Sequence, residues 1–305
     1  MIPSPKAPAD PAAQSRARRR GIVLVLLASA VFTLSAAFVK IIGERIPTAE
    51  IILFRNLFAI PALLPVVLAA GGWSAIATRN PLGHAARTVF GMMGMIGAFY
   101  GYVHLPLATV TALGFTMPLF LTVLAVPLLK ERVGWRRGIA VVVGFLGVVL
   151  MVRPDGLPSG EAGLAVLLCL LGALGWALAM ITIRRMGESG ESSVAIVFWF
   201  TVGATVLAGI ATIPVWVWPT PLEWALLIGI GLVSALAQVL MTEAYRRGET
   251  SLLAPFEYAA IIWTTTLGAL VWAELPGGWD FAGIAVLVGA GLYIWHREVT
   301  LGVRR

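Results

Sequence analysis

Two nearly identical heptapeptides mark equivalent places in the two halves of this chain. Residues 138–144 read GIAVVVG and residues 283–289 read GIAVLVG, 145 positions further on. Each heptapeptide lies at the end of one half of a chain of 305 residues. A match of this kind indicates a duplicated structural unit. The number of elements in each unit then decides how the two copies are oriented.

Lipid is predicted to be the solvent around most of this chain. Hydrophobic residues make up 59% of the sequence and charged residues 12%, which leaves too few polar side chains to cover a soluble globule of this size. Apolar runs of about twenty residues suit helices that cross a hydrocarbon layer of roughly 30 Å, whereas a membrane barrel would show segments of about ten alternating residues. We therefore expect an all-α integral membrane protein.

Ten apolar runs predict ten transmembrane helices, five in each half. Their expected ranges are 21–42, 48–70, 83–103, 105–129, 138–152, 163–183, 193–215, 222–245, 251–273 and 281–295. The fifth and tenth are the shortest, and both carry the repeated heptapeptide, so they correspond to each other. At offsets of 143 or 144 residues, further matches pair segment 32–40 with 176–184, Phe54 with Phe198, Tyr102 with Tyr245 and Glu131 with Glu274. The repeat therefore spans almost the whole chain.

This register divides the chain into two repeats and two tails. We predict a disordered basic cytoplasmic tail at 1–20, a first repeat at 21–153 (helices one to five), a second repeat at 161–297 (helices six to ten) and a cytoplasmic tail at 298–305. The basic tail before an apolar run is also the pattern of a signal peptide, with cleavage after Ala37 as the alternative. We favour a retained helix because the run reaches Ile42, beyond the 7 to 15 residues of a signal sequence.

The basic residues indicate topology and not a nucleic-acid partner. The net charge is +7, but the charges occur in short clusters between apolar runs. If the N-terminus is cytoplasmic, the basic residues on the inner side are Lys6, Arg16, Arg18, Arg19, Arg20, Arg79, Lys130, Arg132, Arg136, Arg137, Arg184, Arg185, Arg246, Arg247, Arg297, Arg304 and Arg305. The outer loops hold only Arg45 and Arg153, with Lys40 near the outer face. The positive-inside rule therefore predicts a multi-pass protein of the cell (inner) membrane with both termini cytoplasmic.

An odd number of crossings in each repeat means that the second repeat enters the membrane from the opposite side. The two five-helix repeats are then inverted relative to each other. Inverted repeats suit a transporter, because an exchange of conformation between two equivalent halves converts an outward-open cavity into an inward-open one. This reasoning rests on architecture, and fold alone does not define function.

Several segments resemble a known family. They are LLKERVGWRRGIAVVVGFLGVVLMVRP at 128–154, WAELPGGWDFAGIAVLVGAG at 272–291 and APFEY at 254–258. They are similar to the drug/metabolite transporter superfamily in its ten-helix form, which consists of two EamA-type repeats. The resemblance implies a basket of ten helices around a central cavity, cytoplasmic termini and, in most members, export of small metabolites or amino acids. Similar members include aromatic amino acid exporters and S-adenosylmethionine uptake proteins, so the motifs leave the substrate open.

Three polar residues at membrane depth need an explanation. Charged side chains there cost roughly 2.5 to 3.5 kcal/mol on insertion scales and usually face the bundle interior or a cavity. Glu257, next to Tyr258, either contacts a substrate ammonium or protonates during coupling, or it is a structural carboxylate. Arg55 either holds a substrate carboxylate or pairs internally. Gln238 is either a contact between helices or a hydrogen-bond donor in a cavity.

Aromatic and proline residues inside the predicted helices leave two readings open. Trp176, Trp263, Tyr100 and Tyr102 either line an apolar cavity or face lipid. Pro118 and Pro255 act either as hinges or as fixed kinks. Tryptophans near helix ends, Trp295 among them, are expected at the membrane interface. The single cysteine, Cys169, is expected to be a small buried side chain.

The sequence favours a secondary transporter over an enzyme. The motifs GxxxxGK[ST], HExxH and GxSxG are absent and the three histidines are scattered, so we predict no cofactor and no metal. We predict export of small amphiphilic metabolites such as amino acids, including aromatic ones. The alternative is uptake of S-adenosylmethionine or a similar metabolite, and a remoter one is an intramembrane enzyme. The expected partners are a small-molecule substrate and the lipid bilayer. The oligomeric state is left open.

Overall fold

In the computed structural model, every regular element of the part described is a helix. That part comprises residues 11–129, 134–152, 160–247 and 250–300. The α-helices are α1 (Pro11–Ile42), α2 (Thr48–Ala69), α3 (Pro81–His104), α4 (Leu107–Gly114), α5 (Met117–Leu129), α6 (Trp135–Val152), α7 (Gly160–Glu188), α8 (Ser193–Thr212), α9 (Pro221–Arg247), α10 (Thr250–Glu257), α11 (Ala260–Trp272) and α12 (Gly278–Thr300). Two short 3₁₀ helices are η1 (Gly72–Ile76) and η2 (Ile213–Val215). The predicted all-α class is confirmed.

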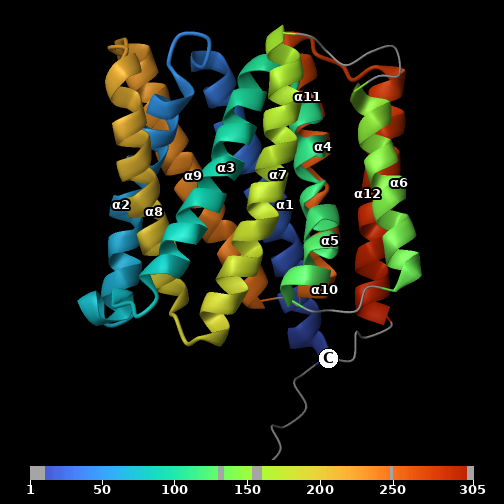
Figure 1. The fold of residues 1–305 in the computed structure, drawn as a ribbon, viewed down its shortest axis with the longest axis horizontal. Helices are drawn as coiled ribbons and strands as arrows, with labels where there is room; N and C mark the ends of the chain where they lie inside the picture. The colour runs from blue at the N-terminus through green and yellow to red at the C-terminus, as the bar shows by residue number, and fades with distance from the viewer. Residues whose placement is uncertain (1–10, 130–133, 153–159, 248–249, 301–305) are drawn as a thin grey trace, which may run out of the picture.

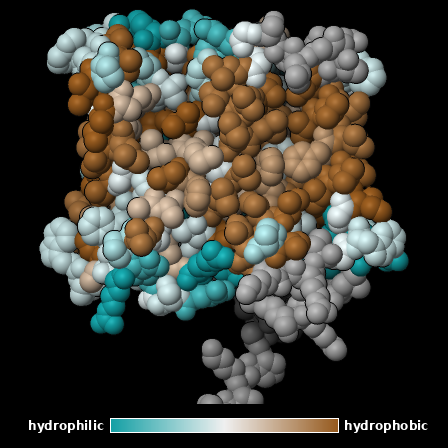
Figure 2. Space-filling model, in the orientation of Figure 1, coloured by the Kyte–Doolittle hydropathy of each residue, from teal (hydrophilic) through white to brown (hydrophobic). Residues whose placement is uncertain are grey.

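The helices stand side by side in one bundle, as Figure 1 shows. Eight segments of the described part are long and apolar enough to cross a membrane, and α4 together with α5 counts as one of them. Large apolar side chains on the outside, such as Leu68 and Ile210, are more than half exposed. Figure 2 shows a hydrophobic band between more hydrophilic ends on the face in view. A broad apolar exterior of this kind is compatible with lipid and not with water, so the chain is a multi-pass membrane protein.

Two predicted helices are interrupted near their middle. The expected helix 105–129 is divided into α4 and α5. Pro118 follows this break; it has no N–H to donate to the carbonyl of Gly114, and its ring crowds that carbonyl. The expected helix 251–273 is divided into α10 and α11, where Tyr258 N donates to Pro255 O at 3.3 Å, a bond between residues three apart. The tighter 3₁₀ geometry there ends the α-helical ladder.

The longest helices pack as four pairs. They are α3 with α7, α1 with α9, α6 with α12, and α2 with α8. The repeated heptapeptides lie in α6 and α12, where glycines allow close approach of the two backbones. A Cβ atom built on Gly147 would lie 2.8 Å from the carbonyl oxygen of Gly283, and one built on Gly283 would lie 2.4 Å from that of Gly147. Side chains at these positions would push the two helices apart.

The first and last helices define one end of the bundle. α1 begins and α12 ends at the bottom of Figure 1, and we call this end the terminal face and the other the opposite face. α1 begins at Pro11, earlier than the predicted start at Gly21, so residues 11–20, expected in a disordered tail, are helical. Residues 1–10 and 301–305 of the expected tails lie outside the described part.

A carboxylate at the terminal face joins two connections of the bundle. Glu191, between α7 and α8, accepts hydrogen bonds from Thr78 Oγ1 at 2.9 Å and from Arg79 N at 3.0 Å. His84 Nε2 of α3 lies 3.3 Å from its other oxygen. Burial raises the pKa of Glu191, but these hydrogen bonds and the charge of His84 outweigh burial, so the pKa lies below its ordinary value. The carboxylate form therefore stabilises the fold here.

We expect Glu191→Ala to lower the free energy of unfolding by about 1 to 3 kcal/mol at neutral pH, because three hydrogen-bonding groups lose a charged acceptor. A group whose pKa is lowered on folding contributes its full stabilisation above the unfolded value, about 4.3 for glutamate. This contribution is lost as the pH falls through the lowered folded value. Thermal unfolding in detergent at several pH values measures the effect.

Glu188→Ala is the matched control, because Glu188 lies three residues away and its side chain is 63% exposed in an ion pair with Arg184. Its effect should stay within about 0.5 kcal/mol. Equal unfolding temperatures for the two variants at neutral pH would contradict the role of Glu191. A difference in unfolding temperature that does not become smaller at acidic pH would also contradict this role.

Candidate functional site

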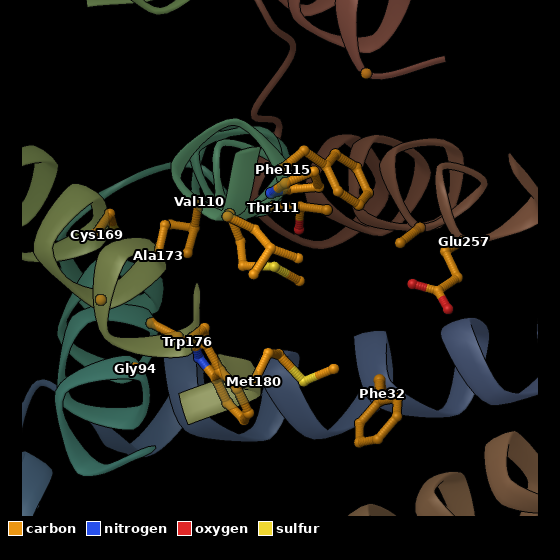
Figure 3. A pocket seen from close by; sticks show the side chains of 18 of the residues that line it. Phe32, Gly94, Val110, Thr111, Phe115, Cys169, Ala173, Trp176, Met180 and Glu257 are labelled. Atoms are coloured by element: carbon orange, nitrogen blue, oxygen red, sulfur yellow. The ribbon is translucent and has the colours of Figure 1, made fainter. Parts of the chain in front are cut away.

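A cavity of about 1080 Å³ lies in the centre of the bundle. Most of the lining comes from α1, α3, α4, α5, α7, α9, α11 and α12. Figure 3 shows part of it, with Phe115 and Thr111 on one wall, Trp176 and Met180 on another, and Glu257 at one side. Ligand cavities commonly measure about 300 to 1,000 Å³. The space is therefore sufficient for a small organic molecule.

The lining reaches the terminal face. It includes Leu129 at the end of α5, Arg137 in the first turn of α6, Arg184 near the end of α7 and Trp295 near the end of α12. On α1 the lining stops at Ala36, six residues before the helix ends at the opposite face. Among the described residues, the lining thus extends to the terminal face and, on α1, stops short of the opposite face.

Most of the candidate residues predicted from the sequence lie on this cavity. Those on the lining are Glu257, Tyr258, Arg55, Gln238, Trp176, Tyr102 and Pro118. They come from α2, α3, α5, α7, α9, α10 and the break after α10. The tertiary structure thus brings together residues that are as much as 203 positions apart in sequence.

Three candidates are not among the described lining residues. The ring of Tyr100 packs on that of His104, with centroids 4.1 Å apart. Trp263 of α11 donates from Nε1 to Ser29 Oγ of α1 at 3.1 Å, so it joins two helices of the wall. Pro255 lies inside α10, three residues before the break.

Two aromatic rings meet where the broken helices are interrupted. Phe115 follows the end of α4, Tyr258 follows the end of α10, and their ring centroids are 4.5 Å apart. The two residues are separated by 143 positions, which is the register of the repeat. Each of the paired residues therefore occupies the equivalent place in its own half. Contact between equivalent residues is expected close to an axis that relates two repeats.

Trp176 lies on the cavity wall because α3 has a glycine opposite it. A Cβ atom built on Gly94 would lie 2.2 Å from Trp176 Nε1. The absence of a side chain lets the indole lie directly against α3, and Figure 3 shows the two residues adjacent. A second glycine on the lining, Gly114, has no atom within 4 Å of a built Cβ. Gly114 therefore borders open space.

The cavity holds an acidic and a basic side chain on different walls. Glu257 ends α10, and its carboxylate extends into the space that Figure 3 shows. Arg55 of α2 contacts Asn56 Oδ1 at 3.5 Å and Met95 Sδ at 3.9 Å. Asn56 is held in turn by a 2.8 Å hydrogen bond from its Nδ2 to the carbonyl of Ile52. This combination of charges and aromatic surface suits an amphiphilic ligand.

A buried lysine joins three segments at the opposite face. Lys40 Nζ lies 2.8 Å from Glu274 Oε1 and donates to the carbonyl of Leu105 at 2.8 Å. The ring centroid of Trp272 lies 5.6 Å from the same nitrogen. Ala273, which adopts a left-handed φ of 55°, turns the chain between α11 and Glu274. We call Lys40, Leu105 and Glu274 the opposite-face lock.

Sequence reasoning missed several lining residues. Arg137 and Arg184 were attributed to topology and Trp295 to the membrane interface, yet all three line the cavity at the terminal face. Phe115 was not identified, although its offset of 143 residues from Tyr258 could have indicated it. Cys169 is buried, as expected, and also borders the cavity. In the described ranges, no group of three or more histidine, cysteine, aspartate or glutamate residues could hold a metal ion.

Comparison with known proteins finds a transporter family and relatives that are named as transporters. The model of the EamA-like transporter family matches residues 19–153 and 163–295. An S-adenosylmethionine uptake transporter of Rickettsia prowazekii is 27% identical over 91% of this chain and 93% of its own. A pseudopaline exporter of Pseudomonas aeruginosa is 31% identical over 89% and 94%. A riboflavin transporter of Vibrio cholerae is 27% identical over 92% and 94%.

A solved structure shares the fold. It has 19% sequence identity and a TM-score of 0.61, and the match covers 95% of this chain and 98% of the other. At this level of identity the likeness concerns the fold alone.

The two cavity glycines provide a test of the packing on Trp176. We expect Gly94→Ala to lower the free energy of unfolding by about 1 to 3 kcal/mol, because the new methyl group overlaps the indole and forces it or α3 to move. Gly114→Ala should be neutral or slightly stabilising, since its methyl group meets open space. Thermal unfolding of the two purified variants measures the difference. Equal stabilities would mean that the contact between Gly94 and Trp176 is not tight.

Proposed function

Because the chain belongs to the EamA-like transporter family, we propose that it is a secondary transporter that works by alternating access. The observation that carries the proposal is the cavity of about 1080 Å³. Its lining extends to the terminal face and, on α1, stops at Ala36, before Lys40 of the opposite-face lock. A carrier that alternates between two sides is expected to present its site to one side at a time. The relatives reported above are also named as transporters.

We further propose that the chain crosses the membrane ten times, in two inverted repeats of five crossings. α3 is 24 residues long, roughly 36 Å at the helical rise. α10 and α11 together form the counterpart of α4 and α5. With α3 and the α10–α11 pair added, the eight apolar segments become ten crossings.

The packing of the helices supports the inverted arrangement. In the repeat register, α1 corresponds to α7, α2 to α8, α3 to α9 and α6 to α12. The pair α3–α7 is then equivalent to the pair α9–α1, and both pairs pack extensively. The pairs α2–α8 and α6–α12 each join a helix to its own counterpart. A pseudo-twofold axis in the membrane plane would produce this pattern.

The two repeats differ in how their interrupted helices pack, as alternating access requires. α4 and α11, the halves near the opposite face, pack against each other. By symmetry α5 and α10, the halves near the terminal face, should also pack together, but in the described part they do not do so to a comparable extent. The cavity extends to the terminal face on this side. The bundle therefore has the form expected of one of the two states of a carrier.

The positive-inside rule favours a cytoplasmic terminal face, so we infer that this state is open to the cytoplasm. In the proposed cycle a small amphiphilic metabolite, such as an amino acid, enters from the cytoplasm and leaves on the outer side. Trp176, Tyr102 and Tyr258 would contact its apolar part, and Glu257 and Gln238 its polar groups. Tyr100 and Trp263 would support the walls, and the breaks near Pro118 and Pro255 would act as hinges.

The relatives support both directions of transport. Those named as S-adenosylmethionine uptake transporters favour the uptake alternative, and the one named as a pseudopaline exporter favours export. The family match gives no support to the remoter alternative of an intramembrane enzyme. Counterflow into proteoliposomes with labelled L-phenylalanine, S-adenosylmethionine and riboflavin would distinguish the substrate classes. No counterflow of any of the three would contradict the proposed function.

Breaking the opposite-face lock should favour the state that is open to the opposite face. The reporter is a cysteine on the cavity lining, Thr111→Cys, in a protein whose native cysteine is removed by Cys169→Ser. We expect Lys40→Met or Glu274→Gln to increase the rate at which a membrane-impermeant maleimide, added from the side of the opposite face, modifies this reporter. Each loss of about 1.4 kcal/mol in the closed state corresponds to tenfold more of the open state. The charge-reversed pair Lys40→Glu with Glu274→Lys should restore part of the protection.

Arg45→Gln is the matched control, because Arg45 pairs with Glu223 at the same face and is not among the described lining residues. In this control the reporter cysteine at position 111 should be modified at the same rate as in the protein with an intact lock. Unchanged labelling in both lock variants would exclude the lock from the closure of this face.

Glu257→Gln tests the proposed role of the only carboxylate on the described lining. We expect the variant to fold normally, because the amide keeps the size and the acceptor oxygen of the carboxylate. Transport should fall or lose its pH dependence, because the titratable group is removed. Counterflow at several pH values measures both. The same flux with the same pH dependence as the parent would return Glu257 to a structural role.

A further inference from the structure

Arg55 faces the cavity, and its contacts in the described part include no acidic residue. It is one of the lining residues, on the seventh position after the start of α2 at the opposite face. Its polar contacts are the weak ones to Asn56 Oδ1 and Met95 Sδ. Within the described ranges, no ion pair includes Arg55. A guanidinium has five N–H groups, so most of its donor capacity is unused.

The guanidinium of Arg45, which is not on the described cavity lining, has more hydrogen-bond acceptors than that of Arg55. Arg45 donates to both oxygens of Glu223 and to the carbonyl of Trp218 at 3.0 Å. Arg45 is also exposed, so water can hydrate it. Arg55 lacks a carboxylate partner of this kind, and its partly exposed side chain faces the cavity at a depth where charged groups are costly. A ligand that supplies negative charge would remove this cost while it is bound.

The nearest acidic residue on the same helix does not serve as its partner. Glu50 is five positions before Arg55, and its Oε2 accepts a hydrogen bond from Val217 N at 3.1 Å, on the outer connection between α8 and α9. Glu257 is also separated from Arg55. Each lies about 10 Å from its own face by helical rise, which leaves roughly 10 Å of depth between them in a 30 Å hydrocarbon layer. The ammonium and carboxylate of one α-amino acid cannot span that distance.

We propose that Arg55 is a carboxylate-binding subsite at the closed end of the cavity, and that the transported substrate carries a carboxylate. The proposal rests on the proposed transport function and specifies its substrate class. The planar guanidinium matches a carboxylate in a bidentate pair. A singly charged carboxylate is neutralised by one arginine, whereas a doubly charged phosphate would require further cations. Two lining residues that interact with Arg55 are Met95 and Tyr102, and both are uncharged.

The experiment compares matched ligands that differ in the carboxylate alone. Competition against labelled L-phenylalanine counterflow is measured with unlabelled L-phenylalanine and with its amide. In the parent protein the acid should compete roughly 10- to 100-fold better than the amide, since hydrogen bonds to charged groups have effects of this size. Arg55→Gln should reduce this ratio to about one. Arg55→Lys should give an intermediate ratio, because it keeps the charge and loses the planar fork.

A binding measurement extends the test to variants that no longer transport. L-Phenylalanine should raise the unfolding temperature of the detergent-solubilised parent, and this shift should be absent in Arg55→Gln. The control Arg45→Gln should keep both the shift and the acid-to-amide ratio. Inorganic phosphate is the comparison ligand and should give no shift.

The outcomes separate this inference from the proposed function. If counterflow persists and the acid-to-amide ratio is the same in the parent and in Arg55→Gln, the subsite is wrong while the transport proposal stands. Stabilisation by phosphate and not by L-phenylalanine would also overturn the carboxylate assignment. If no probe is transported and none binds, both proposals fail.

Discussion

The requirement that backbone polar groups be satisfied without water is the constraint on which this structure depends. In hydrocarbon an unpaired N–H or C=O group costs several kcal/mol, so crossing segments are continuous helices unless they are shielded from lipid. The described part of the bundle contains two helix breaks near its middle, after α4 and after α10. Both occur beside the central cavity, where Phe115 and Tyr258 contact each other. The irregular backbone thus lies where protein and cavity, and not lipid, surround it.

The same low-dielectric environment explains how differently the charged residues are arranged. Lys40 is buried at the opposite face, and a carboxylate and a carbonyl satisfy its ammonium. Arg55 faces the cavity with only weak contacts to uncharged groups. A satisfied charge holds segments together, whereas an unsatisfied one has a favourable interaction available for a ligand. The contrast gives the proposed cycle a lock at one face and a binding group beneath it.

Much of the architecture was predictable from the sequence, because it follows from repetition and hydrophobicity. The heptapeptides identified α6 and α12 as equivalents before their packing was known, and Gly147 of α6 and Gly283 of α12 proved to be points of close backbone contact. The helix breaks were harder to predict. Pro118 indicated the first, but Tyr258 lies in the second break, which itself contains no proline. Tyr100 and Tyr102 differ by two positions on α3, about 200° around the helix, so only one of them lines the cavity.

By itself, the sequence determined that this protein is helical, apolar on its outside and duplicated, because these properties depend on residue types and on their spacing along one chain. It also limited the charged candidates at membrane depth to a few residues. Only the tertiary structure decided which of them share a cavity, which face that cavity reaches and whether each charge has a partner. These properties depend on distances between α2, α3, α7 and α10, and such distances are set by side-chain packing between helices that are remote in sequence.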